Sequence, residues 1–128
     1  MHVLSSRILL RPSDPEASRR FYGERLGLPV YREFGTGPDR GTVYFLGGGF
    51  LEVSGRAAPA EPQPRLRLWL QVADVRAAHR ELLDQGVDIV REPVTEPWGL
   101  VEMWIADPDG VEIVVVEVPE DHPLRYRP

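Results

Sequence analysis

The most constraining feature of this chain is a strand–helix pattern that occurs twice. Residues 7–27 read RILLRPSDPEASRRFYGERLG, and residues 67–86 read RLWLQVADVRAAHRELLDQG. Charged side chains recur at a constant spacing of sixty residues: Arg7 and Arg67, Asp14 and Asp74, Arg20 and Arg80. A half-length unit used twice predicts two similar modules related by a pseudo-twofold axis, with a cleft along that axis. Functional side chains are therefore expected at matching positions of the two modules.

Each copy of the pattern continues as a strand, a helix and three further strands. An aspartate is placed to cap each helix and a glycine to end it: Asp14 and Gly27, then Asp74 and Gly86. Turns join the later strands, at residues 47–49 (GGG) and at residues 107–110 (DPDG). The fold class is therefore α+β, with two β-α-β-β-β modules forming curved mixed sheets around a cleft and helices on the outside.

The spacing of apolar residues predicts which faces are buried. The first helix, followed by Gly27, uses Ala17 and Phe21 as apolar anchors. The second helix has a four-residue apolar stripe: Val75, Ala78, Leu82 and Leu83. Two strand faces are uniformly aliphatic and should lie under the helices: Ile8 and Leu10 in one strand, and Leu66, Leu68, Leu70 and Val72 in the other. The opposite faces mix charged, amide and aromatic groups, as expected of a cleft.

The chain is long enough for one domain, which we divide into four parts. A first module spans 5–55, a linker rich in Pro and Ala spans 56–65, a second module spans 66–118, and a polar tail spans 119–128. Each module alone would expose one apolar sheet face. We therefore expect a homodimer, in which modules are closed within one chain or exchanged between chains.

Composition narrows the function. The chain has 128 residues, 42% of them hydrophobic, a formal net charge of −5 and no cysteine. Interspersed charges without a basic stripe argue against nucleic acid. The lack of cysteine excludes disulfides, thiolate metal sites and a cysteine nucleophile. No signal pattern and no apolar run of about 20 residues are present, so we expect a cytoplasmic protein without membrane contact.

Three segments carry a resemblance to a known family: SDPEASRRFYGERLGL (13–28), VADVRAAHRELLDQGV (72–87) and ADPDGVEIV (106–114). In this order and spacing they resemble the vicinal oxygen chelate superfamily, which includes glyoxalase I, extradiol dioxygenases, and fosfomycin and bleomycin resistance proteins. The resemblance implies sheets curled around a cleft. It also implies one metal ligand at a set point on the first and last strand of each module. Here those points fall on Arg7, Glu52, Arg67 and Val114.

These four residues are a poor set of metal ligands. A guanidinium stays protonated and has no free lone pair, and valine has no donor atom, so only Glu52 could bind a metal. A register shift of two residues would bring Glu112 to the fourth point. The three histidines, His2, His79 and His122, lie outside the predicted cleft strands. A divalent metal is therefore disfavoured, and the chain is closest in character to metal-free, bleomycin resistance-like members.

We predict a ligand-binding set drawn from the cleft faces: Arg7, Leu9, Glu52, Arg67, Trp69, Gln71, Glu112 and Val114. Arg7 and Arg67 have two interpretations. They orient a carboxylate or phosphate of a ligand, or they pair with Glu52 or Glu112 in an internal charge network. Trp69 is equally compatible with ligand stacking and with a core or dimer contact.

Two classes of function remain open, with a protein-binding module as a third. The first is a metal-free protein that binds or sequesters a small organic molecule with an anionic or aromatic group, as bleomycin resistance proteins do. The alternative is a lyase, isomerase or dioxygenase of the same superfamily. Such an enzyme would have an atypical metal site, or would use Glu52 as a metal-free catalytic base.

Overall fold

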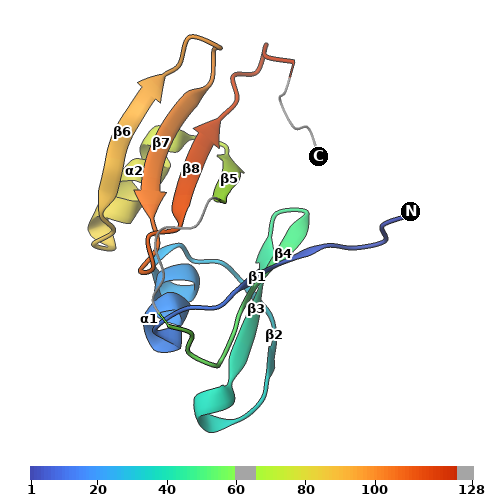
Figure 1. The fold of residues 1–128 in the computed structure, drawn as a ribbon. Coiled ribbons are helices and arrows are strands. Elements are labelled where there is room, and N and C mark those ends of the chain that lie inside the picture. Colours follow the sequence, from blue (N-terminus) through green and yellow to red (C-terminus); the bar gives the residue numbers. More distant parts are fainter. Residues whose placement is uncertain (60–65, 124–128) are drawn as a thin grey trace. The chain divides into compact units, whose positions relative to one another are not determined.

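Each half of the chain forms a four-stranded mixed sheet with its own helix (Figure 1). The computed structural model describes residues 1–59 and 66–123, and the chain divides into a first unit, Met1–Pro62, and a second unit, Gln63–Pro128. Residues 60–65 of the predicted linker and 124–128 of the predicted tail lie outside the described residues. That the modules make one domain stays a prediction.

The first unit opens with β1 (Arg7–Leu10), followed by α1 (Pro15–Arg19) and a π-helix at Arg20–Arg25. Its remaining strands are β2 (Val30–Phe34), β3 (Gly41–Leu46) and β4 (Gly49–Val53), with a 3-10 turn at Gly37–Asp39 between β2 and β3. The strand order is β1-β4-β3-β2. The pair β1–β4 is parallel and the other two pairs are antiparallel.

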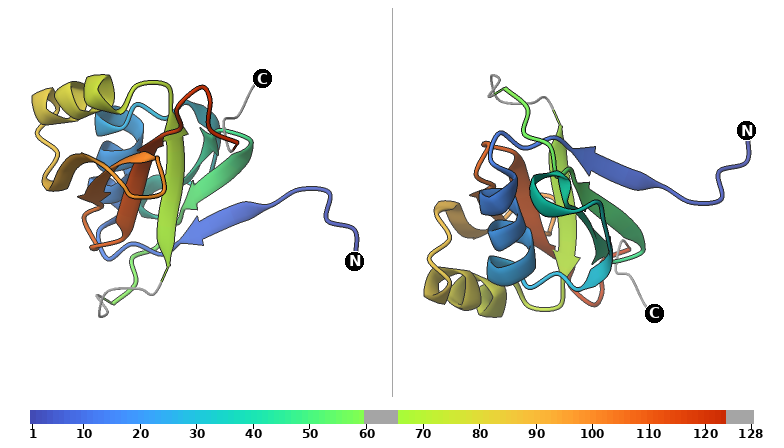
Figure 2. Two further views of the ribbon diagram at one scale, coloured as in Figure 1. Left: turned by 90° about the horizontal axis from the view of Figure 1, so that it is seen from above. Right: turned by 90° about the horizontal axis from the view of Figure 1, so that it is seen from below.

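The second unit repeats this plan. It consists of β5 (Arg67–Val72), α2 (Val75–Asp84), β6 (Ile89–Thr95), β7 (Val101–Ala106) and β8 (Glu112–Glu117). The strand order β5-β8-β7-β6 matches that of the first unit, again with one parallel pair, β5–β8. Helix α2 packs against β6, β7 and β8, and lies to one side of them in Figure 2. The predicted α+β class and the two β-α-β-β-β modules are confirmed.

Both predicted helix starts are confirmed. The Asp14 carboxylate accepts a hydrogen bond from the Ala17 backbone N–H, and the Asp74 carboxylate accepts from two, those of Arg76 and Ala77. Gly27 and Gly86 follow the helices with φ of 70° and 74°, where a side chain would be strained.

The first helix differs from the predicted regular helix, because its second part is a π-helix. The Leu26 N–H donates to the Phe21 carbonyl five residues back. The wider turn buries two consecutive aromatic residues, Phe21 and Tyr22, whose rings meet edge to face at 5.0 Å. The apolar spacing of a regular α-helix could not predict that both residues are buried, because of the two it identified only Phe21 as an apolar anchor.

The predicted buried faces are confirmed in part. Leu68, Val75 and Leu82 are buried. Leu83 and Leu66 are exposed, the latter because β5 begins only at Arg67. Ile8 is also exposed, so the aliphatic face of β1 is only partly covered.

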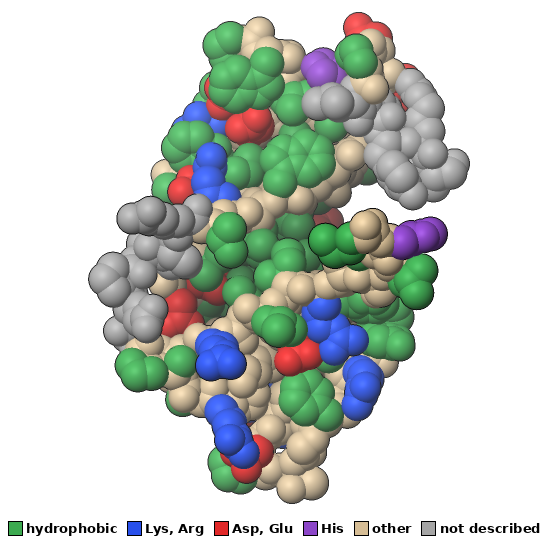
Figure 3. All heavy atoms as spheres, turned by 45° about the vertical axis from the view of Figure 1, so that its right-hand side comes forward, with side chains coloured by type: hydrophobic (Ala, Val, Ile, Leu, Met, Phe, Trp, Pro, Cys, Tyr) green, Lys and Arg blue, Asp and Glu red, His purple; other side chains and the backbone are tan. Residues whose placement is uncertain are grey.

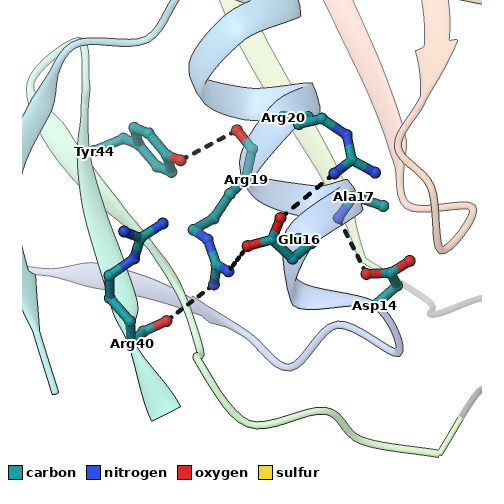
Figure 4. Close-up of polar contacts among 7 residues, drawn as sticks. All are labelled: Asp14, Glu16, Ala17, Arg19, Arg20, Arg40 and Tyr44. Carbon is teal, nitrogen blue, oxygen red and sulfur yellow. Dashed lines mark hydrogen bonds and ion pairs between the residues drawn. The ribbon is translucent and has the colours of Figure 1, made fainter. Parts of the chain in front are cut away.

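A polar cluster fastens α1 to the neighbouring strands (Figure 4). The Arg19 guanidinium donates to the Arg40 carbonyl and to the Glu16 carboxylate, at 2.9 and 2.7 Å. The Tyr44 hydroxyl of β3 donates to the Arg19 carbonyl at 3.3 Å. Burial raises the pKa of Tyr44, while the Arg19 contact lowers the pKa of Glu16. We assign this cluster to structure, because its contacts join the helical segment to other residues of the same unit.

A β-bulge occurs at the same place in both units. Val30 and Arg32 of β2 oppose the adjacent residues Tyr44 and Val43, so Tyr31 is one residue too many. In β6, Ile89 and Arg91 oppose Ile105 and Trp104 in the same way, which makes Val90 the extra residue: the equivalent of Tyr31. Such bulges redirect side chains. No helix in the described parts of the chain is long and apolar enough to cross a membrane.

Candidate functional site

In each unit the helix covers one face of the sheet, and the predicted site residues lie on the other, which we call the helix-free face. In the first unit, the helix side carries Tyr44, whose hydroxyl contacts α1. In the second, it carries Glu117, whose carboxylate accepts a hydrogen bond from the Val75 N–H at the start of α2. Alternation along the strands then places the predicted residues on the helix-free faces, listed by strand: Arg7 and Leu9, Glu52, Arg67, Trp69 and Gln71, Glu112 and Val114.

The two arginines each pair with a carboxylate of their own unit. Arg7 Nη1 donates to Glu52 Oε1 at 2.9 Å, and Arg67 Nη2 donates to Glu112 Oε1 at 2.8 Å. The internal charge pairing considered from the sequence is therefore present. The side chains remain partly accessible, with Arg7 36% and Arg67 47% exposed, so both keep donors that a ligand could reach. That Arg7 and Arg67 face one another stays a prediction.

The register decides which residues are equivalent. Leu9 lies opposite Glu52, and Trp69, its counterpart, lies opposite Val114. Val114 therefore corresponds to Glu52, and no shift of two residues brings Glu112 to that point. Glu112 corresponds instead to Phe50, which lies opposite Arg7. Hence the pair Arg67–Glu112 runs straight across two strands, whereas Arg7–Glu52 runs diagonally.

The apolar members of the predicted set differ in exposure. Trp69 is 50% and Leu9 64% exposed, which leaves apolar surface for a ligand. Val114, by contrast, is buried in a cluster of aliphatic residues with Trp104 packed against it: Leu100, Val114, Val116 and Val118. Val114 therefore contributes packing rather than exposed surface to the second unit's helix-free face. Figure 3 shows one side of the molecule, where hydrophobic side chains lie among acidic and basic ones.

A cationic group around Trp104 was not singled out from the sequence. The Arg91 guanidinium lies 3.7 Å and that of Arg67 5.2 Å from the Trp104 ring. Arg91 also forms an ion pair with Glu96. The indole N–H of Trp104 is buried without a hydrogen-bond partner. The bulge in β6 aligns Arg91 with Trp104, and no sequence pattern predicts that bulge.

An aromatic cluster on the first unit was also missed. Tyr31, Phe45 and Phe50 contact one another on the helix-free face, and we call them the aromatic platform. The sequence predicted a turn at residues 47–49, but Gly49 is the first residue of β4. A two-residue turn, Gly47–Gly48, sets Leu46 opposite Gly49 and therefore Phe45 opposite Phe50.

The metal-ligand points of the resembled family do not fit a divalent ion in this chain. Two are guanidinium groups, one is a valine, and Glu52 is held by Arg7. Within residues 1–59 and 66–123, no group of three or more histidines, aspartates and glutamates is arranged to hold a metal ion. We therefore derive no metal-dependent step.

Comparison with known proteins settles the family. A model of the Glyoxalase/Bleomycin resistance protein/Dioxygenase superfamily matches residues 4–115. The chain belongs to this superfamily. The vicinal oxygen chelate resemblance is thereby confirmed at the level of the superfamily. Among curated proteins, none matches the chain significantly.

Solved structures agree with this assignment of the fold. A superfamily member from Sphaerobacter thermophilus DSM 20745 is 24% identical, with a TM-score of 0.72 over 91% of this chain and 98% of that one. The protein SMU.1112c is 27% identical, with a TM-score of 0.75 over 91% and 99%. A glyoxalase/bleomycin resistance protein/dioxygenase from Nocardioides is 19% identical, with a TM-score of 0.70 over 99% and 91%.

Proposed function

We propose that this superfamily member binds or sequesters a small organic molecule without a metal. One observation carries the proposal: at the first-strand point of each unit stands an arginine already paired with a carboxylate, Arg7 with Glu52 and Arg67 with Glu112. An arginine–glutamate pair cannot chelate a cation, but it can orient a polar group on a ligand.

The proposed roles follow from exposure and chemistry. Trp69 and Leu9 offer exposed apolar surface for the body of the ligand. Arg7 and Arg67 use their remaining donors for an anionic or carbonyl group, and Gln71 adds an amide. Glu52 and Glu112 hold the two guanidinium groups in place. In the second unit, Val114 is buried against Leu100, Val116 and Val118.

Binding is preferred to catalysis because Glu52, the one candidate base, is already engaged. Arg7 Nη1 donates to Glu52 Oε1 at 2.9 Å, so only Oε2 is left to accept a proton from a substrate. A lyase, isomerase or dioxygenase activity is kept as the alternative. We also propose that the protein is a cytoplasmic homodimer, which light scattering would test.

The proposed function is tested by ligand titration with 2-naphthoate, a planar acid, and its neutral amide. Trp69→Ala should weaken both ligands about tenfold, because the stacking surface is lost. Arg67→Ala should weaken 2-naphthoate more than the amide, because only the acid uses the charge. Leu83→Ala, on the exposed side of α2, is the matched control and should change neither affinity.

Two results would contradict the proposal. One is unchanged affinity in both Trp69→Ala and Arg67→Ala. The other is a stoichiometric Zn, Fe, Mn or Ni ion that survives dialysis of the wild type and is lost in Glu52→Ala, which would favour the enzymatic alternative.

A further inference from the structure

The aromatic platform presents ring surface to solvent. The centroid of Tyr31 lies 5.1 Å from that of Phe45 and 4.8 Å from that of Phe50, and Phe45 and Phe50 are 5.7 Å apart. These are normal aromatic packing distances. Tyr31 is nevertheless 48% and Phe45 41% exposed. The three rings therefore stabilise one another and still leave a surface on which another ring can stack.

The platform is not required by the fold. Its residues correspond by register to three residues of the second unit that share no aromatic character: Val90, Ala106 and Glu112. The second unit forms the same sheet with the same bulge and without these rings. In the first unit the bulge places Tyr31, its extra residue, against Phe45 and Phe50. Because the architecture does not require the aromatic platform, we look for its role in binding.

The charges around the platform favour an uncharged ligand. Arg7 lies 5.9 Å from the Phe50 ring and is neutralised by Glu52. This pair therefore adds no net positive charge that would favour an anion over a neutral ligand. Arg32, on the next row of the same face, is exposed to water, where a charge contact contributes little.

The size of the platform favours a small molecule over a second protein surface. A large aromatic side chain offers roughly 150–250 Å² of surface, so Tyr31 and Phe45, each nearly half exposed, offer roughly 200 Å² together. A stable protein interface needs about 800 Å² on each partner. One or two fused rings would cover the platform.

We propose that the aromatic platform is a stacking site for a planar, uncharged aromatic molecule. The proposal rests on the proposed small-molecule binding function and names the chemistry that the first unit selects. It also makes a prediction separate from that function, because it uses Tyr31, Phe45 and Phe50 rather than Arg67 and Trp69.

The test is an NMR titration of the full chain with three probes of related shape: 2-naphthol, naphthalene-2-sulfonate and decahydro-2-naphthol. The first is planar and neutral, the second planar and anionic, and the third neutral but not planar. We expect 2-naphthol to shift the ring signals of Tyr31, Phe45 and Phe50. It should bind at least fivefold more tightly than decahydro-2-naphthol, and no less tightly than the sulfonate.

Variants that copy the second unit make the test specific. The double variant Tyr31→Val, Phe45→Ala installs the second unit's residues and should weaken 2-naphthol at least tenfold. Tyr31→Val alone, at an exposed bulge residue, should weaken it by a smaller factor if the double variant folds poorly. Val90→Ala, at the equivalent bulge of the second unit, is the control and should leave the affinity unchanged.

Three outcomes would overturn the platform as a ligand site. The first is 2-naphthol binding that persists unchanged in the double variant, which would leave the proposed function itself intact. The second is tighter binding of the sulfonate, which would show selection by charge. The third is ring signals that move with protein concentration alone, which would show that a second copy covers the platform.

Discussion

The two units share one frame and carry different chemistry on it. Strand order, helix caps and the bulge agree between them. At equivalent positions of the helix-free faces the residues differ, with the first unit's residue named first: Leu9 and Trp69, Val43 and Trp104, Phe50 and Glu112, Glu52 and Val114. Two pairs of arginines are retained at equivalent positions, Arg7 with Arg67 and Arg32 with Arg91. The comparison teaches that the helix side preserves the architecture, while the other side is free to diverge.

The largest effect is expected from equivalent core truncations. Leu51 and Ile113 are both fully buried on the helix side and lie opposite Ile8 and Leu68 in the parallel strand pairs. Leu51→Ala and Ile113→Ala should each lower the free energy of unfolding by about 3 kcal/mol, because each leaves a cavity. Urea denaturation measures both. A loss below about 1 kcal/mol in one of them would show that the helix-side cores are not equivalent.

A smaller and unequal effect is expected at the helix caps. Asp74 accepts two backbone hydrogen bonds, and Asp14 accepts one. Asp74→Ala should therefore cost about 1 kcal/mol, and Asp14→Ala about half of that. Asparagine at either position keeps an acceptor and is the control. Equal losses in the two alanine variants would mean that hydrogen-bond number does not decide the strength of these caps.

The smallest effect is a pH dependence confined to the first unit. Burial raises the pKa of Tyr44 above its ordinary value of 10.0, whereas its equivalent in the second unit is Ile105. The unfolded chain therefore ionises first, and the stability that Tyr44 contributes is complete below pH 10 and is lost as the pH rises beyond it.

This pH dependence is measured by comparing the wild type with Tyr44→Phe at pH 8 and pH 11. The variant should lose less stability on going to pH 11, because the ionising hydroxyl is gone. An identical loss in both proteins would show that Tyr44 has no part in alkaline unfolding. The other tyrosines are present in both proteins and cancel in the comparison.

Prediction from the sequence succeeded where a pattern is local. The caps at Asp14 and Asp74 and the β-α-β-β-β succession along the chain follow from neighbouring residues. The turn was predicted at residues 47–49 and is one residue shorter, because Gly49 already pairs with Leu46. Exposure was harder to predict. Leu66 and Leu83 have suitable spacing, but Leu66 lies just before β5 and Leu83 lies on the exposed side of α2.

The members of the candidate site remain a prediction, and the sequence did not determine which of them contact one another. The sequence indicated that Arg7 and Arg67 occupy equivalent points, and it left the partners of each arginine open. The register showed that one pair runs diagonally and the other straight across. The group around Trp104 depends on the bulge in β6, which changes the alignment of strands without a recognisable sequence signal.

The sequence by itself determined the duplicated plan of this protein, because repeats, caps and turns are written in residues close to one another along the chain. Only the tertiary structure decided the π-helix at Phe21, the placement of Tyr31 on the aromatic platform and the ion-pair partner of each arginine. The physical reason is that the platform and the ion pairs depend on which residues of distant strands lie side by side, while the π-helix depends on burying both Phe21 and Tyr22. That is settled by packing and register across the sheet rather than by the preferences of any one segment.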